Sequence, residues 1–192
     1  MRLRRDLARL TLAAALAIAL VLTACSSKED AVEYRGVTEV GQFTLRLPVA
    51  WQTAPGPQPA ANDQSSLGTF VLTANNGDPK AEDAGMIFIV RDDLTNQSMD
   101  KLAQAWSTDE RILWSTFDGF DPTEIDGQTV LQGEGQARTL IGQKFDNMVA
   151  IYNHPARPAE AWILNCQSPT PMPSEVKGIC GTAIESFRIA MP

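Results

Sequence analysis

The sequence predicts an α+β domain built on an antiparallel sheet, and three features of its pattern lead to that fold class. Several strand-like segments come first and are followed by one helix-like segment. Three longer strand-like segments then succeed one another across short turns, which is the pattern of a β-meander. The clearest helical stripe of the chain comes last. Strands and helices are therefore grouped by type, as in α+β domains.

Strand signals mark the first half of the domain. Apolar residues alternate with polar ones over 43–47, which predicts a strand with one buried face, and residues 37–40 can pair with it as a hairpin. Residues 68–73 and the continuous apolar run 86–90 predict two further strands. Between the first strand and these two, the proline-rich stretch 52–66 predicts a long exposed loop.

The first expected helix follows the run at 86–90. Ser98 is suited to cap it, and Asp100 favours its positively polarised first turn. Its apolar stripe consists of Met99, Leu102, Ala103 and Trp106. Residues 128–138, 143–152 and 159–166 then predict the three strands of the meander.

The final helix is expected to begin at Ser174, which is suited to cap it. Its apolar stripe has the spacing of a helix with one buried face. The stripe consists of Val176, Ile179, Cys180, Ala183, Ile184 and Phe187. Gly178 and Gly181 lie inside this helix, where each costs about 1 kcal/mol relative to alanine. We therefore expect close packing, or a disulfide at Cys180, to offset that cost.

The order of these elements and three short segments resemble the PsbP-like domains, and most closely their bacterial lipoprotein branches, the DcrB-like and LpqN-like proteins. The segments are 41–51, whose strand ends in Leu-Pro before an aromatic residue, 125–127 and 184–188. The resemblance implies an α/β/α sandwich formed by a single domain over residues 37–192. It also implies a non-catalytic role in the cell envelope, and it carries no catalytic residue over to this chain.

The N-terminal segment has the three parts of an export signal. Arginines at positions 2, 4, 5 and 9 precede an apolar run over residues 10–22, and small residues lead from that run to Cys25. The segment Leu22-Thr23-Ala24-Cys25 resembles the lipobox of bacterial lipoproteins. That resemblance implies that the signal peptide 1–24 is removed and that Cys25 is lipidated with fatty acyl chains such as palmitate.

Lipidation of Cys25 would anchor the protein to the outer face of the cytoplasmic membrane or to the periplasmic side of an outer membrane. A retained transmembrane helix is the alternative, but the apolar stretch has about 15 residues and a spanning helix needs about 20. Residues 25–36 lack periodicity and predict a flexible tether between the lipid and the domain.

The net charge of the chain limits the classes of partner. The formal net charge is −7 at pH 7, and loss of the arginine-rich signal makes the mature chain more acidic, so a nucleic-acid partner is not expected.

Cys166 and Cys180 remain once Cys25 carries lipid, and an even pair in an exported protein predicts a disulfide. Two reduced thiols are the alternative, but their spacing fits neither a redox motif nor a complete zinc site.

The sequence offers few groups for catalysis or metal binding. His154 is the only histidine and the chain has no Gly-x-Ser-x-Gly segment, so we expect a surface loop residue in place of a Ser-His-Asp relay. Residues 118–124 gather three carboxylates without the ligand spacing of an EF-hand, which favours a solvated acidic turn over a Ca²⁺ site. We therefore expect no catalytic residue, no metal and no cofactor.

Large aromatic residues in irregular segments are the best candidates for recognition. Trp51, Trp114, Phe117 and Phe120 could form an exposed patch, because tryptophan is enriched at binding surfaces. Burial in the core is the alternative. We expect a non-catalytic envelope lipoprotein that binds a protein partner or a small envelope ligand. An envelope hydrolase that acts on glycan or lipid is the alternative function.

Overall fold

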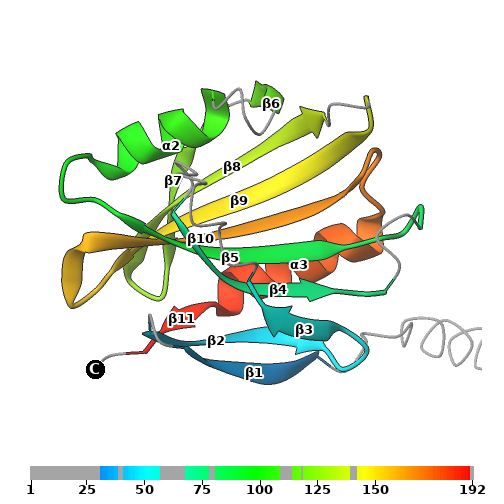
Figure 1. The fold of residues 1–192 in the computed structure, drawn as a ribbon, viewed down its shortest axis with the longest axis horizontal. Coiled ribbons are helices and arrows are strands. Elements are labelled where there is room, and N and C mark those ends of the chain that lie inside the picture. The colour runs from blue at the N-terminus through cyan, green and yellow to red at the C-terminus, as the bar shows by residue number, and fades with distance from the viewer. Residues whose placement is uncertain are drawn as a thin grey trace, which may run out of the picture. The chain divides into compact units, whose positions relative to one another are not determined.

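The computed structural model describes residues 31–38, 41–56, 68–77, 81–108, 114–117, 119–138 and 142–190, with the backbone alone at 108 and 114–117. The expected signal peptide 1–24 and the lipidation site Cys25 lie outside these residues, as does 57–66 of the expected loop. Figure 1 shows the described domain. Within it, no helix is long and apolar enough to cross a bilayer.

The larger sheet contains all three strands of the expected meander. Along the sheet, the described strands run in the order β3 (Gln52–Pro55), β4 (Thr69–Asn75), β5 (Met86–Asp93), β10 (Arg157–Pro169), β9 (Lys144–His154), β8 (Gln128–Arg138) and β6 (Trp114–Phe117), with β7 (Asp121–Ile125) also paired to β8. Neighbouring strands pair antiparallel throughout. The predicted antiparallel sheet and its β8–β9–β10 meander are confirmed.

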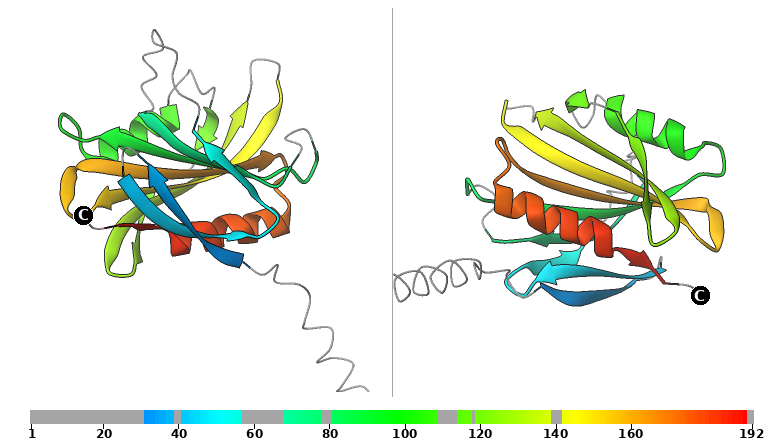
Figure 2. Two further views of the ribbon diagram at one scale, coloured as in Figure 1. Left: turned by 60° about the horizontal axis from the view of Figure 1, so that its bottom comes forward. Right: turned by 180° about the vertical axis from the view of Figure 1, so that it is seen from behind.

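A smaller sheet and two helices complete the described domain. The small sheet has the order β1 (Ala31–Thr38), β2 (Gly41–Pro48) and β11 (Arg188–Ile189). Helix α2 (Met99–Thr108) lies on one face of the larger sheet, and α3 (Ser174–Ser186) lies on the opposite face (Figures 1 and 2). The predicted α/β/α sandwich is therefore confirmed.

Each face of the larger sheet has its own hydrophobic core. One core lies between the sheet, α3 and β2 and includes Phe43, Trp162 and Phe187. The other lies under α2 and includes Trp106 and Ile163. Trp162 and Ile163 are neighbours on β10 and point to opposite faces, because side chains alternate along a strand. A strand buried on both faces accounts for the continuous apolar run in the middle of β10.

A disulfide joins the sheet to the helix that covers it. Cys166 on β10 is bonded to Cys180 on α3, and their Cα atoms are 5.8 Å apart. Both residues are fully buried in the core beneath α3. The bridge therefore fixes α3 against the sheet from within the core.

The structure corrects the predicted tether. Residues 31–36 belong to β1, so the expected flexible segment 25–36 enters the fold at Ala31. Tyr34 packs against Phe43, with 6.4 Å between ring centroids. Gly36 is buried against the same ring, and a Cβ built on it would lie 2.2 Å from Phe43. This glycine interrupts the apolar alternation that would have revealed the strand.

Two exposed strands replace predicted irregular segments. Gln52–Pro55, expected in a loop, form β3 at the edge of the larger sheet, where Pro55 is tolerated because edge strands have unpaired backbone groups. The expected acidic turn contributes β7, which forms a hairpin with β8. Asp126 and Gly127 connect them with φ values of 50° and 74°, the positive angles that a two-residue hairpin turn requires.

The two helix starts differ from each other. The predicted cap of α2 is confirmed, because Ser98 Oγ accepts a hydrogen bond from the Lys101 N–H at 3.3 Å. Ser174 is instead the first helical residue of α3, and Pro173 precedes it without a side-chain cap. Of the two explanations expected for Gly178 and Gly181, close packing does not apply, because a Cβ built on either glycine would meet no atom within 4 Å, whereas the disulfide at Cys180 is present.

Candidate functional site

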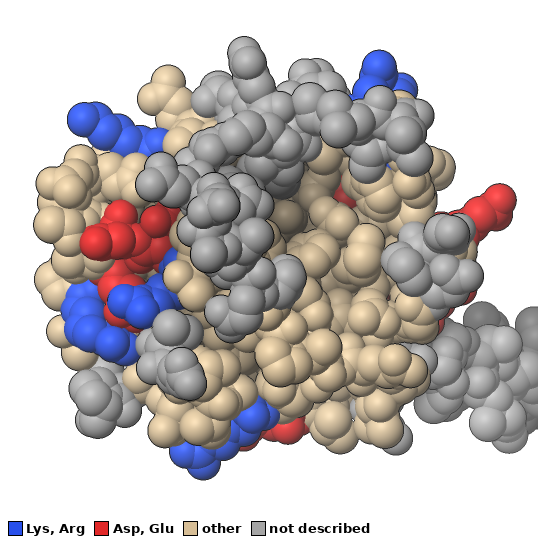
Figure 3. All heavy atoms as spheres, in the orientation of Figure 1, with Lys and Arg blue, Asp and Glu red and all other residues tan. Residues whose placement is uncertain are grey.

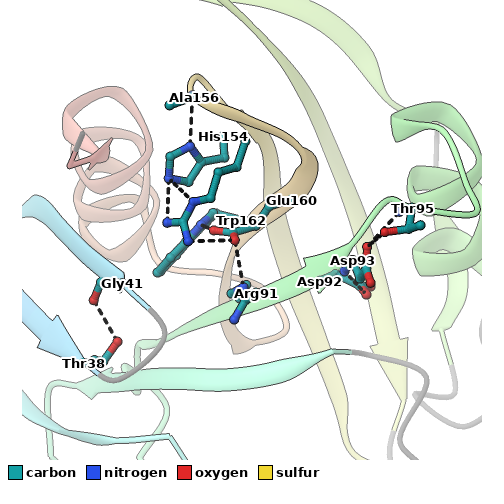
Figure 4. A network of polar contacts seen from close by, with 11 residues as sticks. Thr38, Gly41, Arg91, Asp92, Asp93, Thr95, His154, Ala156, Glu160 and Trp162 are labelled. Atoms are coloured by element: carbon teal, nitrogen blue, oxygen red, sulfur yellow. Dashed lines mark hydrogen bonds and ion pairs between the residues drawn. The ribbon is translucent and has the colours of Figure 1, made fainter. Parts of the chain in front are cut away.

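Polar side chains gather at the turn between β9 and β10. We call this group, Arg91, His154, Arg157, Glu160 and Trp162, the turn network (Figure 4). Acidic and basic side chains lie side by side at this end of the domain (Figure 3). The network contains the only histidine of the chain, so it is the first place to look for acid–base chemistry.

His154 is buried, which corrects the expected surface position. The residue is 0% exposed and is the last residue of β9. The Ala156 N–H donates to Nδ1 at 3.1 Å, and the Arg157 guanidinium lies against Nε2, with Nε at 3.1 Å and Nη2 at 2.8 Å. Burial lowers the pKa of His154, and the positive charge of Arg157 lowers it further.

The surroundings of His154 do not suit a catalytic base. Both ring nitrogens face donors, whereas a neutral imidazole has only one nitrogen that accepts. Protonation would leave neither nitrogen able to accept, and it would place a second positive charge beside Arg157. The imidazole is therefore held neutral, with its accepting nitrogen directed at the protein and away from any substrate.

Glu160 is bound on both carboxylate oxygens. The Trp162 indole N–H donates to Oε1 at 2.7 Å. Oε2 forms ion pairs with Arg91 Nε at 3.1 Å and Arg157 Nη1 at 3.3 Å. Glu160 therefore pairs with two arginines and ties β5 to β10. The turn network therefore holds β5 and β10 together at this end of the sheet.

A groove lies beside α3 at the other end of β9. Its volume is about 280 Å³, just below the range usual for ligand pockets. Its lining comes from three places: β8 and β9 of the sheet, the turn before α3, and α3 itself. The lining residues are Glu134, Gly135, Gln136, Asp146, Asn147, Met148, Pro171, Met172 and Lys177.

Asp146 holds the walls of this groove together. Its Oδ1 accepts hydrogen bonds from Gln136 Nε2 at 2.8 Å and Thr170 Oγ1 at 2.9 Å. Its Oδ2 accepts from the Met172 N–H at 2.8 Å. One carboxylate thus fixes the turn before α3 to two strands. Because carboxylate hydrogen bonds are strong, the groove is shaped in advance of any ligand.

The rim of the groove is charged and its lining is partly apolar. Lys177 Nζ pairs with Glu134 Oε2 at 2.8 Å, and both side chains are exposed. Met148 and Met172 are partly buried against the core beneath α3. Thioether side chains adapt to different partners, so these methionines suit a surface for binding. The arrangement offers hydrogen bonds, one lysine and two methionine side chains, and its lining contains no serine, threonine or cysteine.

The predicted aromatic patch does not form as a unit. Trp51 is 7% exposed and belongs to the core beneath α3, where its indole lies against Gly85. Phe120 is partly buried against the core beneath α2. Trp114 and Phe117 lie on β6, and their side chains are outside the described residues. For Trp51, core packing is therefore the correct alternative.

The groove was missed by sequence reasoning because no single segment contains it. Glu134 and Gln136 alternate along β8, and Asp146 and Met148 alternate along β9. The strand register places Glu134 opposite Met148 and Gln136 opposite Asp146. Alternation alone could have assigned each pair to one face, but the sequence does not reveal the register or the return of α3.

The described residues do not form a metal centre. Among them, no three histidine, cysteine, aspartate or glutamate side chains lie close enough to hold a metal ion. The segment expected as an acidic turn supplies Asp121 and Glu124 to the exposed strand β7, while Asp118 lies outside the described residues.

Comparison with known proteins places the chain by its fold. No family model matches the sequence, and no curated protein matches it either. Among solved structures, LpqN of Mycobacterium tuberculosis, which is involved in cell envelope biogenesis, superimposes with a TM-score of 0.57 at 15% identity. The match covers 84% of this chain and 92% of LpqN.

Two further solved structures have the same architecture. Cyanobacterial PsbP (CyanoP) from Synechocystis superimposes with a TM-score of 0.57 at 10% identity, over 86% of this chain and 96% of CyanoP. The Ran-binding protein Mog1p of Saccharomyces cerevisiae gives a TM-score of 0.54 at 12% identity, over 83% of this chain and 96% of Mog1p. The chain therefore has the PsbP-like fold that LpqN and CyanoP share.

Proposed function

We propose that this protein is a cell-envelope lipoprotein, anchored through lipidated Cys25, whose domain binds a protein partner or a small envelope ligand without catalysing a reaction. The export signal and the segment Leu22-Thr23-Ala24-Cys25 support the anchor. The fold shared with LpqN, which is involved in cell envelope biogenesis, supports the location. The fold shared with Mog1p, a Ran-binding protein, supports a protein partner.

The groove beside α3 is the observation that carries the binding function. Asp146 fixes its walls, Met148 and Met172 supply apolar surface, and the Lys177–Glu134 pair supplies charge at the rim. A volume of about 280 Å³ suits one side chain of a partner or a small ligand. The enclosure of His154 and Glu160 within the turn network supports binding over hydrolysis, because these groups are engaged in internal contacts.

Site-specific photocrosslinking in intact cells tests the groove. A photoreactive residue at Lys177, on the groove rim, is compared with one at Lys101, an exposed lysine on α2. We expect a distinct crosslinked adduct from position 177 and none from position 101. If the ligand is small, we expect native mass spectrometry to show its added mass on the protein. The same adducts from both positions, or neither adduct nor bound mass from position 177, would contradict the groove as the binding surface.

Cell fractionation tests the anchor. Cys25→Ala should move the protein from the membrane fraction to the soluble fraction, because a stable anchor needs covalent lipid. Ser26→Ala, one residue along the chain, is the control and should leave the protein in the membrane. Retention of the Cys25→Ala variant in the membrane would contradict the proposed lipoprotein.

A further inference from the structure

The early start of β1 leaves a very short connection to the proposed lipid anchor. Only residues 26–30 separate Cys25 from Ala31, the first residue of β1. A fully extended chain gains at most about 3.6 Å per residue, so the Cα atoms of Cys25 and Ala31 can be no more than about 22 Å apart. A tether that reached Gly36 would extend nearly twice as far.

This reach is small compared with the domain. A folded domain of about 160 residues has a radius of gyration of about 15 Å and hence a diameter of roughly 40 Å. The headgroup layer on one side of a bilayer takes up a further 5–8 Å or so of the tether's reach. The surface around the start of β1 must therefore remain close to the lipid headgroups, while the far end of the domain cannot reach them.

Exposed valines lie at this end of the β1–β2 hairpin. The short connection between β1 and β2 makes them antiparallel, so the turn after β2 lies beside the start of β1 (Figure 2). Val32, the second residue of β1, is 49% exposed, and Val49, in the turn after β2, is 69% exposed. Ala50, next to Val49, is also exposed.

We propose that the surface formed by Val32, Val49 and Ala50 rests on the headgroup layer of the membrane that holds Cys25. The proposal depends on the proposed lipidation, because the anchor is what brings this surface to the bilayer. The three residues carry no charge, so the contact does not depend on anionic lipid. The acidic chain would gain nothing from an anionic surface. The groove beside α3 remains free for another partner.

Depth-dependent fluorescence quenching tests the contact. Single cysteines replace Val32, Val49 or Val37 in the lipidated protein, and each carries the same fluorophore. Val37 is the comparison position, because it lies on the same strand, is 66% exposed, and is about 16 Å further from the tether, although residues five apart point to opposite faces of a strand. In phosphatidylcholine vesicles with nitroxide-labelled headgroups, we expect at least twofold stronger quenching at positions 32 and 49 than at 37. Equal quenching at all three positions, or none, would overturn the proposal.

Two measurements separate this proposal from the proposed function. Protein that carries acyl mass on Cys25 and floats with the vesicles, but shows no selective quenching, would overturn the membrane contact alone. Absence of acyl mass would overturn both. Inserting about 20 Gly and Ser residues after Ser27 lengthens the reach of the tether several-fold and should reduce quenching at position 32 by at least half. Unchanged quenching would show that the short tether does not set the contact.

Discussion

At the scale of single residues, His154 links the structure to pH. Burial, and then Arg157, lowers its pKa below the ordinary value of 6.5, while the carboxylate of Glu160 acts in the opposite direction and Arg91 adds to the lowering. The unfolded chain therefore binds this proton more readily than the folded chain does. Neutral His154 therefore contributes to the free energy of unfolding. This contribution is fully present above about pH 6.5 and is lost as the pH falls through the lowered pKa.

Thermal unfolding of wild type and His154→Asn tests this linkage. Between about pH 7.5 and pH 5.5, the Tm of the wild type should fall further than the Tm of the variant, because asparagine cannot take up the proton. The quantity compared is the change in Tm between the two pH values for each protein, so the test holds even if the variant is less stable at both pH values. An equal fall in both proteins would contradict a buried, neutral His154.

Glycines in two environments give opposite expectations. Gly178→Ala should stabilise the domain by about 1 kcal/mol, because Gly178 is exposed in α3 and its Cβ would meet no atom within 4 Å. Gly36→Ala should destabilise it by about 1–3 kcal/mol, because the Cβ would overlap the buried ring of Phe43. Urea unfolding of both variants measures the two free energies. Destabilisation by Gly178→Ala would show that this glycine has a packing role after all.

At the scale of elements, the disulfide connects α3 to the larger sheet. The bonded cysteines are 14 positions apart, and closing a loop of that size contributes about 3 kcal/mol in the chain-entropy model. Replacing both Cys166 and Cys180 with alanine should lower the free energy of unfolding by at least that amount, as urea unfolding would show. Thiol alkylation of the unfolded, unreduced wild type provides the direct check, and two alkylated thiols would refute the bridge.

Asp146 connects the start of β9 to the turn before α3. Asp146→Ala should cost about 2 kcal/mol of unfolding free energy, because it removes hydrogen bonds from Gln136, Thr170 and the Met172 N–H to a charged acceptor. Asp121→Ala, on the exposed strand β7, is the control and should change stability by no more than about 0.5 kcal/mol. A similar effect of both substitutions in urea unfolding would contradict the role of Asp146 as a connector.

Elements with a buried apolar face could be predicted from the sequence, and exposed elements could not. The strands of the meander and both described helices have apolar faces that pack on a core, so their periodicity is visible in the sequence. The short strands β3 and β7 are exposed along nearly their whole length and have no apolar pattern to detect. The groove and the turn network depend on the register between strands, which local sequence does not encode.

At the scale of the whole molecule, the fold and the proposed function are inferred from different observations. LpqN, CyanoP and Mog1p share the architecture of this chain at 10–15% identity. A fold shared at this distance does not determine an activity. The proposed function therefore depends on this chain's own residues: the predicted export signal with Cys25, and the groove beside α3.

The N-terminus of the mature protein tests this account most directly. Intact-mass and peptide mass spectrometry of protein purified from the membrane fraction should give a chain that begins at Cys25 and carries fatty acyl groups on that residue. A chain that begins at Met1, with an unmodified Cys25, would contradict the lipid anchor and the envelope location that depends on it.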